Sequence, residues 1–153
     1  MNHSFPQCKE DFVQQLVYID ENIKELTDLY ISSTPIQERL KHFFSIYFLE
    51  VEELIKINKE KSTIPLFPKV YIGTKVTVLY DDEDETEDYV ICFPEHSDPD
   101  LGYISFLSPV GRQLLLKNVG EQILLQVPTG ALSVTIKEIS YANHLLNQAT
   151  KEA

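Results

Sequence analysis

The densest group of residues that could bind a metal is the acidic run at 81–88, where seven of the eight positions are Asp or Glu. Neighbouring carboxylates can bind Mg²⁺ through their oxygen atoms. The run lacks the glycine and the ligand spacing of a calcium-binding loop, and it lies between two predicted strands. Because blocks of like charge are more often solvated than metal-binding, the sequence predicts an exposed loop here.

No other residues have the spacing of a catalytic or metal centre. The histidines are widely separated, no serine stands in a Gly-x-Ser-x-Gly turn, and the glycines are scattered. Cys8 and Cys92 are isolated and form neither a redox pair nor a zinc motif. The sequence therefore predicts a protein that is not an enzyme, with no catalytic residue, no bound metal and no cofactor.

The composition favours a globular protein with an acidic surface. The chain has 153 residues, 43% of them hydrophobic, and a formal net charge of −11. Nucleic-acid binding needs clustered Lys and Arg, so direct DNA binding is not expected, whereas a basic protein partner would fit. No apolar run is long enough to cross a bilayer, and the N-terminus does not resemble a signal peptide. These features predict a cytoplasmic protein without membrane contact.

The N-terminal part has the pattern of two packed helices. Apolar residues recur at steps of four and three between residues 7 and 30, which is a heptad seam: Phe12, Leu16, Ile19, Ile23, Leu26 and Tyr30. Thr34 and Gln37 have the spacing of a capping box, and Pro35 suits a first helical position. The sequence predicts an antiparallel helical hairpin over 1–62, with its tip at Tyr30, Ile31, Ser32, Ser33 and Thr34.

The second predicted helix is apolar on nearly every side, through Phe43, Phe44, Ile46, Tyr47, Phe48, Leu49 and Val51. One partner helix cannot cover so much apolar surface. The helix is therefore expected either to pack on the C-terminal domain or to form the contact of a homodimer. The third reading is that a few of these side chains are simply exposed.

After a proline-containing linker at 63–68, the sequence predicts a second domain at 69–142 and a tail at 143–153. Strands are expected at 70–80, 89–93, 104–106, 122–127 and 132–141, with a tight turn at Thr129-Gly130. Ser108 and Pro109 have the residue types of a helix start, and the helix should end near Asn118. The expected class is α+β, with an antiparallel sheet and one short helix.

Three segments of this second domain carry a family resemblance. They are Val70-Tyr-Ile-Gly-Thr-Lys-Val-Thr-Val78, Asp98-Pro-Asp-Leu-Gly-Tyr-Ile-Ser105, and residues 107–139 with Ser108-Pro-Val-Gly111. Together they resemble the C-terminal domain of the Gre family of bacterial transcription factors. The resemblance implies an FKBP-like fold. It also implies docking on RNA polymerase, at the coiled coil of the largest subunit that forms the rim of the secondary channel.

The helical hairpin departs from the pattern of the transcript-cleavage factors in that family. Those factors carry acidic residues at the tip of a long coiled coil, where they help to hold a catalytic Mg²⁺. Here the tip has hydroxyl and apolar groups, and the nearest acids are Asp28 and Glu38. The short hairpin and Leu107 are more similar to the Rnk type of regulator. The sequence therefore predicts docking without stimulation of transcript cleavage.

The residues predicted to dock are Ser108, Pro109 and Val110, with Asp98 and Pro99 as weaker candidates. Helix capping alone would also explain Ser108 and Pro109. Two other functions are weighed against a polymerase-binding regulator. One is an FKBP-like peptidyl-prolyl isomerase, with a pocket lined by Tyr71, Tyr80, Tyr89, Phe93, Tyr103 and Phe106. The other is a binding protein that uses the aromatic second helix.

Overall fold

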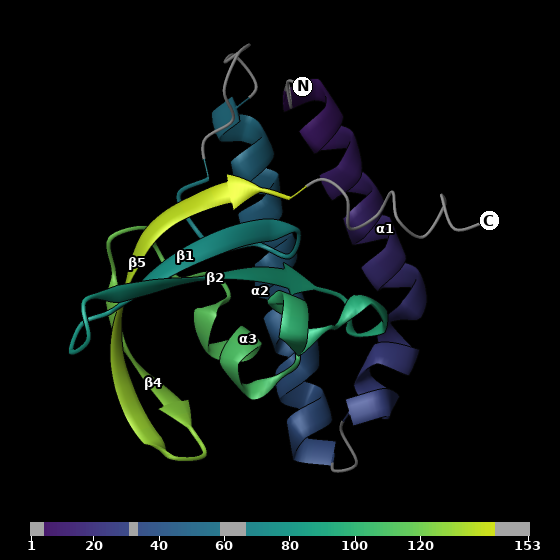
Figure 1. Ribbon diagram of the computed structural model, residues 1–153. Coiled ribbons are helices and arrows are strands. Elements are labelled where there is room, and N and C mark those ends of the chain that lie inside the picture. Colours follow the sequence, from purple (N-terminus) through teal and green to yellow (C-terminus); the bar gives the residue numbers. More distant parts are fainter. Residues whose placement is uncertain (1–4, 31–33, 59–66, 143–153) are drawn as a thin grey trace. The chain divides into compact units, whose positions relative to one another are not determined.

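The computed structural model describes residues 5–30, 34–58 and 67–142, and it describes side chains over 9–26, 42–58 and 67–142 (Figure 1). The chain divides into two compact units, Met1–Leu66 and Phe67–Ala153. Part of the predicted linker (63–66) and the predicted tail (143–153) lie outside the described residues. So do Ile31, Ser32 and Ser33 of the predicted hairpin tip, and the side chains of Tyr30 and Thr34.

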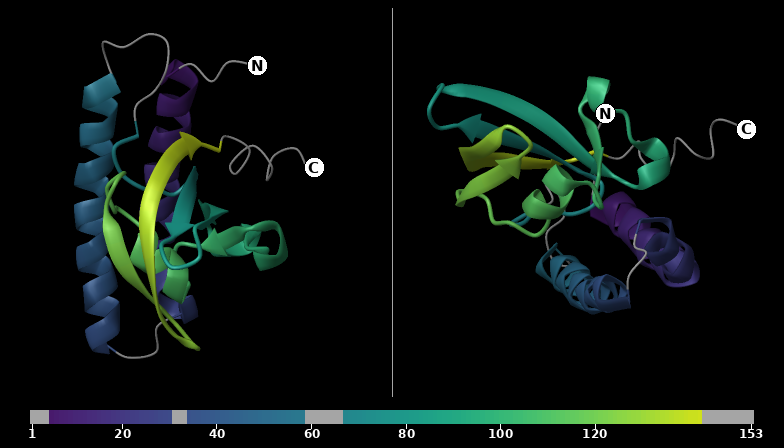
Figure 2. Two further views of the ribbon diagram at one scale, coloured as in Figure 1. Left: turned by 60° about the vertical axis from the view of Figure 1, so that its left-hand side comes forward. Right: turned by 90° about the horizontal axis from the view of Figure 1, so that it is seen from below.

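The first unit is the predicted helical hairpin. Helix α1 spans Phe5–Tyr30 and helix α2 spans Thr34–Asn58, and the two lie side by side in both views of Figure 2. The most buried positions on both helices recur at steps of three, four or seven, as in a packed helix pair. They are Phe12, Gln15, Ile19 and Leu26 on α1 and Phe44, Tyr47, Val51, Leu54 and Asn58 on α2.

Two polar side chains in the hairpin were not predicted by the apolar pattern. Gln15 is buried, and its side-chain oxygen accepts a hydrogen bond from the hydroxyl of the buried Tyr47. This pair satisfies both groups and ties α1 to α2. Asn22 has non-helical backbone angles, with φ −119° and ψ 18°, and its side-chain amide donates to the Tyr18 carbonyl at 2.8 Å. Because this bond competes with the backbone ladder, α1 is kinked at Asn22.

The apolar surface of α2 is buried on one side only. Phe44, Tyr47 and Val51 are at most 2% exposed, whereas Ile46 is 40% and Leu49 is 67% exposed. The alternative in which a few apolar side chains of this helix are exposed therefore holds for Ile46 and Leu49.

The second unit is a five-stranded sheet with strand order β3-β2-β1-β5-β4 and one short helix (Figure 1). The strands are β1 Thr74–Tyr80, β2 Glu85–Cys92, β3 Tyr103–Ser105, β4 Gln122–Val127 and β5 Gly130–Tyr141, and the helix is α3 Pro109–Leu114. The 3₁₀ turns η1 Pro94–His96 and η2 Pro99–Leu101 precede β3. The right-hand view of Figure 2 shows the sheet strongly curled. The fully buried residues of this unit include Leu114, Val134 and Ile136.

The α+β class and the hairpin-then-sheet order are confirmed, with one correction to the sheet. β3 pairs with β2 in parallel, at Val90↔Tyr103 through Cys92↔Ser105, so the sheet is mixed and not wholly antiparallel. β2 and β3 can run parallel because the connection between them is long. It passes through η1 and η2 and returns the chain to the level of Val90 before β3 begins at Tyr103.

Four predicted boundaries were wrong. β1 begins at Thr74 and not at Val70. β2 begins at Glu85, so only Asp81–Asp84 form the turn and the last four residues of the acidic run belong to a strand. Helix α3 ends at Leu114 and not near Asn118, because Leu116 has a positive φ of 66° and its N–H donates to the Val70 carbonyl at 2.7 Å. The tight turn is Pro128-Thr129, since Val127 pairs with Gly130 and Gly130 already belongs to β5.

Candidate docking surface at the corner between β3 and α3

The corner after β3 is held by two serine side chains. The Ser108 hydroxyl donates to the Ser105 carbonyl at 2.7 Å and accepts the Gly111 N–H at 3.1 Å. The Ser105 hydroxyl in turn accepts the Leu107 N–H at 3.0 Å. Ser108 is therefore the N-cap of α3, as its residue type predicted. Because the Ser108 hydroxyl already makes two hydrogen bonds within the corner, its main role is to stabilise the corner.

Gly111 allows α3 to lie directly against the end of β3. A Cβ atom built on Gly111 would be 2.0 Å from the Ser105 carbonyl oxygen and 3.0 Å from the carbonyl carbon. Both neighbours are backbone atoms, so neither can rotate away. The corner therefore needs glycine at this position, and it is rigid enough to present its exposed residues in one arrangement.

The residues of the corner divide into buried and exposed positions. Phe106 is 1% exposed and its ring packs edge-on against Phe93 with centroids 5.7 Å apart, and Leu107 is 7% exposed. Pro109 is exposed, while Ser108 and Val110 are half-buried. Among Ser108, Pro109 and Val110, Pro109 is thus the residue most exposed to solvent.

The other predicted docking residues lie at the opposite end of β3. The Asp98 N–H donates to the Tyr103 carbonyl at 2.8 Å, and the Tyr103 N–H donates to the Asp98 carbonyl at 3.1 Å. Asp98 and Pro99 are exposed. β3 is an edge strand, so both candidate groups flank one edge of the sheet. Tyr103, which pairs with Asp98, and Ser108 are five steps of chain apart, so these two residues are separated by at most about 18 Å.

Leu101 also lies at this edge, and it was not predicted as a docking residue. It is 70% exposed on η2, where its N–H donates to the Asp98 carbonyl at 2.9 Å. The following Gly102 is left-handed, with φ 85°, and ends the turn. An apolar residue between Asp100 and a turn-ending glycine is the signal in the sequence that could have identified it.

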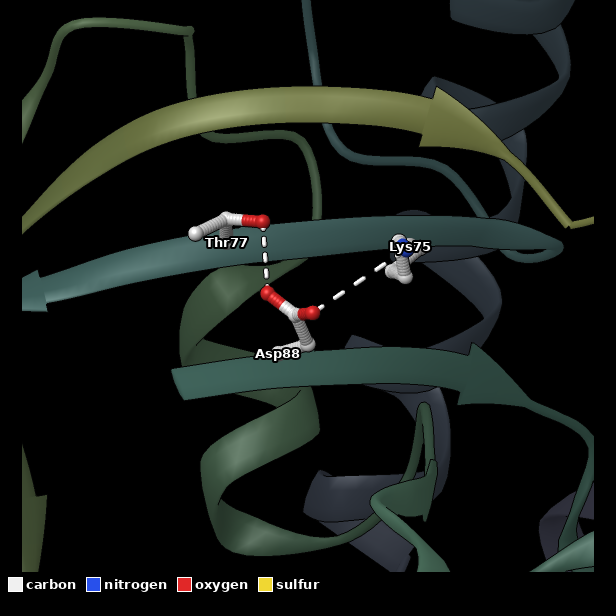
Figure 3. A network of polar contacts seen from close by, with 3 residues as sticks. All are labelled: Lys75, Thr77 and Asp88. Carbon is white, nitrogen blue, oxygen red and sulfur yellow. Dashed lines mark hydrogen bonds and ion pairs between the residues drawn. The ribbon is translucent and has the colours of Figure 1, made fainter. Parts of the chain in front are cut away.

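Glu87 and Asp88 of β2 are bonded to side chains of the neighbouring strand β1, and Figure 3 shows the contacts of Asp88. Asp88 accepts the Thr77 hydroxyl at 2.7 Å and lies 4.0 Å from the Lys75 ammonium. Glu87 accepts the Tyr80 hydroxyl at 2.6 Å. Within the described part of the chain, no group of three or more His, Cys, Asp or Glu side chains could hold a metal ion.

Burial governs the ionisation of the remaining reactive groups. Desolvation, followed by the hydrogen bond to Glu87, raises the pKa of Tyr80 far above its ordinary value. Desolvation also raises the pKa of the buried Cys92 thiol to about 12. A thiol with that pKa stays protonated at neutral pH and is a poor nucleophile.

Asp81 joins three parts of the sheet at the end of β1. Its carboxylate accepts the Ser133 hydroxyl at 2.7 Å, the Thr135 hydroxyl at 2.8 Å and the Gln122 side-chain amide at 2.9 Å. These three bonds, led by the one from Ser133, lower the pKa of Asp81 below its ordinary value of 3.8. The charged form is therefore the one that the folded sheet prefers.

Asp81→Asn should remove part of the acid sensitivity of folding. A carboxyl whose pKa is lowered by folding contributes stability that is present above its unfolded-state pKa and is lost as the pH falls through the folded-state pKa. We expect the free energy of unfolding of the native chain to fall below pH 4 more steeply than that of the variant. Denaturant unfolding between pH 2.5 and 7 measures this, and Asp82→Asn, next along the turn, is the matched control. Parallel curves for native and Asp81→Asn proteins would contradict it.

No helix in the described part of the chain is long and apolar enough to cross a membrane.

Comparison with known proteins points to one family. Residues 66–141 match the family model described as "Transcription elongation factor, GreA/GreB, C-term". The chain is 49% identical over 72 residues to transcription elongation factor GreA of Chlorobium phaeovibrioides, covering 46% of this chain and 45% of that protein. It is 34% identical over 95 residues to GreA of Vibrio parahaemolyticus, covering 62% of this chain and 58% of that protein. The chain thus spans about half the length of the curated relatives it matches.

Solved structures of the same group were also found. A GreA/GreB elongation factor from Nitrosomonas europaea has 25% sequence identity and a TM-score of 0.44, covering 60% of this chain and 79% of that chain. Gfh1, the GreA factor homologue 1 of Thermus thermophilus, has 18% identity and a TM-score of 0.43, covering 86% of this chain and 93% of that chain.

Proposed function

Since the C-terminal unit of this chain belongs to the GreA/GreB family of transcription elongation factors, we propose that the protein is a transcription regulator that binds bacterial RNA polymerase. The observation that carries the proposal is the agreement between the matched segment, residues 66–141, and the compact unit that begins at Phe67. The whole matched domain is therefore present as one folded body. The curated relatives are transcription elongation factors, which supports a regulatory and not a catalytic role.

The docking surface in this proposal is the edge of the sheet at β3. Pro109 and Val110 at the C-terminal end of the strand, with Asp98 and Pro99 at the other end, would contact the channel-rim coiled coil of the largest polymerase subunit. Exposed Leu101 joins them as an apolar contact. The net charge of −11 favours approach to a basic surface.

The helical hairpin would then occupy or compete for the secondary channel. α1 ends at Tyr30 and α2 begins at Thr34, and the intervening Ile31-Ser32-Ser33 carries no carboxylate. We therefore expect no stimulation of transcript cleavage. A short helical hairpin followed by a Gre-like domain resembles the Rnk type of regulator. The protein itself would perform no chemical step.

Pro109→Ala should weaken binding of the full chain to core RNA polymerase about tenfold, which corresponds to 1.4 kcal/mol. The physical reason is that Pro109 is the most exposed residue of a rigid corner, so that its ring is free to fill a pocket on the partner. Titration of labelled full-length protein with core polymerase gives the dissociation constants. Pro128→Ala, an exposed proline in the β4–β5 turn, is the matched control.

Failure of the native chain to bind polymerase would refute the proposed function. Binding that is equal for the native chain and both variants would leave the function standing and reject the corner as the docking surface.

The isomerase alternative is not favoured. Of the aromatic side chains that could have lined a proline pocket, Tyr71, Phe93 and Phe106 are at most 2% exposed and belong to the core. Tyr80 and Tyr89 hydrogen-bond to each other at 2.8 Å. A homodimer through α2 stays a separate proposal, for which the exposed Ile46 and Leu49 supply an apolar surface.

A further inference from the structure

The edge strand β4 is partly covered by a side chain in place of a neighbouring strand. The Gln126 N–H donates to Gln113 Oε1 at 2.7 Å, and Gln113 Nε2 donates to the Gln126 carbonyl at 2.9 Å. The same Nε2 also donates to the Pro109 carbonyl at 2.9 Å, which anchors the amide to α3. Gln113 therefore bonds both outward-pointing backbone groups of Gln126, as one residue of an added strand would do.

The ladder shows which other groups of β4 point outward. Along an antiparallel strand, alternate residues bond to the partner strand and to the opposite side. Because Gln126 faces away from β5, Leu124 and Gln122 also face away. Among the described residues, no backbone group bonds to Leu124 on that side, and the Leu124 side chain is 60% exposed. The edge is therefore open at Gln122 and Leu124 and closed at Gln126.

The composition of β4 suits pairing with a second copy of itself. Edge strands are usually protected by a charge, a proline or a bulge, and Gln122–Val127 contains no charge and no proline. The residues from 122 to 126 are Gln-Ile-Leu-Leu-Gln, which has the same polar and apolar order in both directions. An antiparallel pair with two-fold symmetry centred on Leu124 would place Leu124 opposite its copy, and Gln122 opposite Gln126.

We propose that β4 is a strand-pairing surface for a second copy of this chain, and that Gln113 holds it closed. The symmetric pairing needs the outward N–H and C=O groups of Gln122, Leu124 and Gln126. Gln113 already bonds the outward N–H and C=O of Gln126. The backbone groups that remain at Gln122 and Leu124 are too few to form a strand ladder. Release of this one side chain opens the complete edge.

Gln113→Ala should raise the mass-average molar mass of the full chain about twofold over that of the native protein, as expected for one added copy. Multi-angle light scattering across a concentration series measures the mass, and circular dichroism shows whether each variant is folded. Gln14→Ala is the matched control, because it removes an exposed glutamine side chain from helix α1 and leaves the Gln113 bonds intact. Gln113→Ala combined with Leu124→Lys should return to the native mass, because the two lysines would face each other across the pair.

A folded Gln113→Ala protein with the native mass would overturn the proposal. Association that Leu124→Lys does not reverse would also overturn it, because another surface would then be responsible. Hydrogen exchange of the native chain tests the closed state without any variant. The Gln126 amide should exchange at least about tenfold more slowly than the Leu124 amide, and equal rates would show that Gln113 does not close the edge.

Discussion

Gly111→Ala is expected to destabilise the C-terminal unit by about 3 kcal/mol or more, the upper part of the range for overpacking. The added Cβ would lie 2.0 Å from the Ser105 carbonyl oxygen, less than any tolerated contact between these atoms. Relief requires α3 to move away from β3, which would break the two hydrogen bonds of the Ser108 hydroxyl. The intrinsic preference of alanine for helix, about 1 kcal/mol over glycine, works in the opposite direction and is smaller.

Gly120→Ala separates this clash from ordinary backbone strain. Gly120 has φ 88°, and a Cβ there would meet no atom within 4 Å. Its cost should be the left-handed conformation alone, about 1–2 kcal/mol. Urea unfolding of the native chain and both variants gives the comparison. If Gly111→Ala is no less stable than Gly120→Ala, the corner is more adaptable than its geometry indicates, and docking residues need not be held in one arrangement.

The elements that the sequence predicted best are those whose signal is local. The apolar steps in α1, the alternation in β5 and the serine-proline start of α3 each report on neighbours within one or two turns of chain. Ser108 was accordingly identified as the start of α3, where it is the N-cap.

The features that the sequence did not predict depend on partners far along the chain. Glu85–Asp88 read as loop because they are acidic, yet Asp88 is bonded to Thr77 and Lys75 on the adjacent strand (Figure 3). Such cross-strand pairs stabilise a polar strand that periodicity alone would reject. The parallel pairing of β3 and the side chain of Gln113 on β4 are likewise set by tertiary placement.

The candidate docking surface was predicted in part for the same reason. Ser108, Pro109 and Asp98 came from residue types and from the family resemblance. The sequence could not predict how exposed each of these residues is, or that Leu101 is exposed on η2, because exposure depends on the folded backbone. Leu107, which the resemblance linked to the Rnk type, is only 7% exposed, so it belongs to the core and not to the docking surface.

Added alone to backtracked elongation complexes with Mg²⁺, the protein is expected to leave the rate of transcript shortening unchanged. A second Mg²⁺ in the polymerase site needs additional oxygen ligands, chiefly carboxylates. The residues between α1 and α2 offer only the neutral hydroxyls of Ser32 and Ser33, and Asp28 and Glu38 lie back on the helices. The acids at 81–88 cannot substitute, because they belong to the unit that would stay at the channel rim.

The same experiment with a true cleavage factor present should show inhibition that rises with the concentration of this protein, because both would dock at one rim. Pro109→Ala should need about tenfold more protein for the same inhibition, in step with its weaker binding, while Pro128→Ala should match the native chain. Faster shortening by the native chain alone would reject the prediction, and Asp28→Asn and Glu38→Gln would then show whether these acids hold the metal. Inhibition that Pro109→Ala leaves unchanged would mean that competition does not run through the corner between β3 and α3. The docking surface would then have to be sought on the helical hairpin, whose exposed Ile46 and Leu49 would be the first residues to replace.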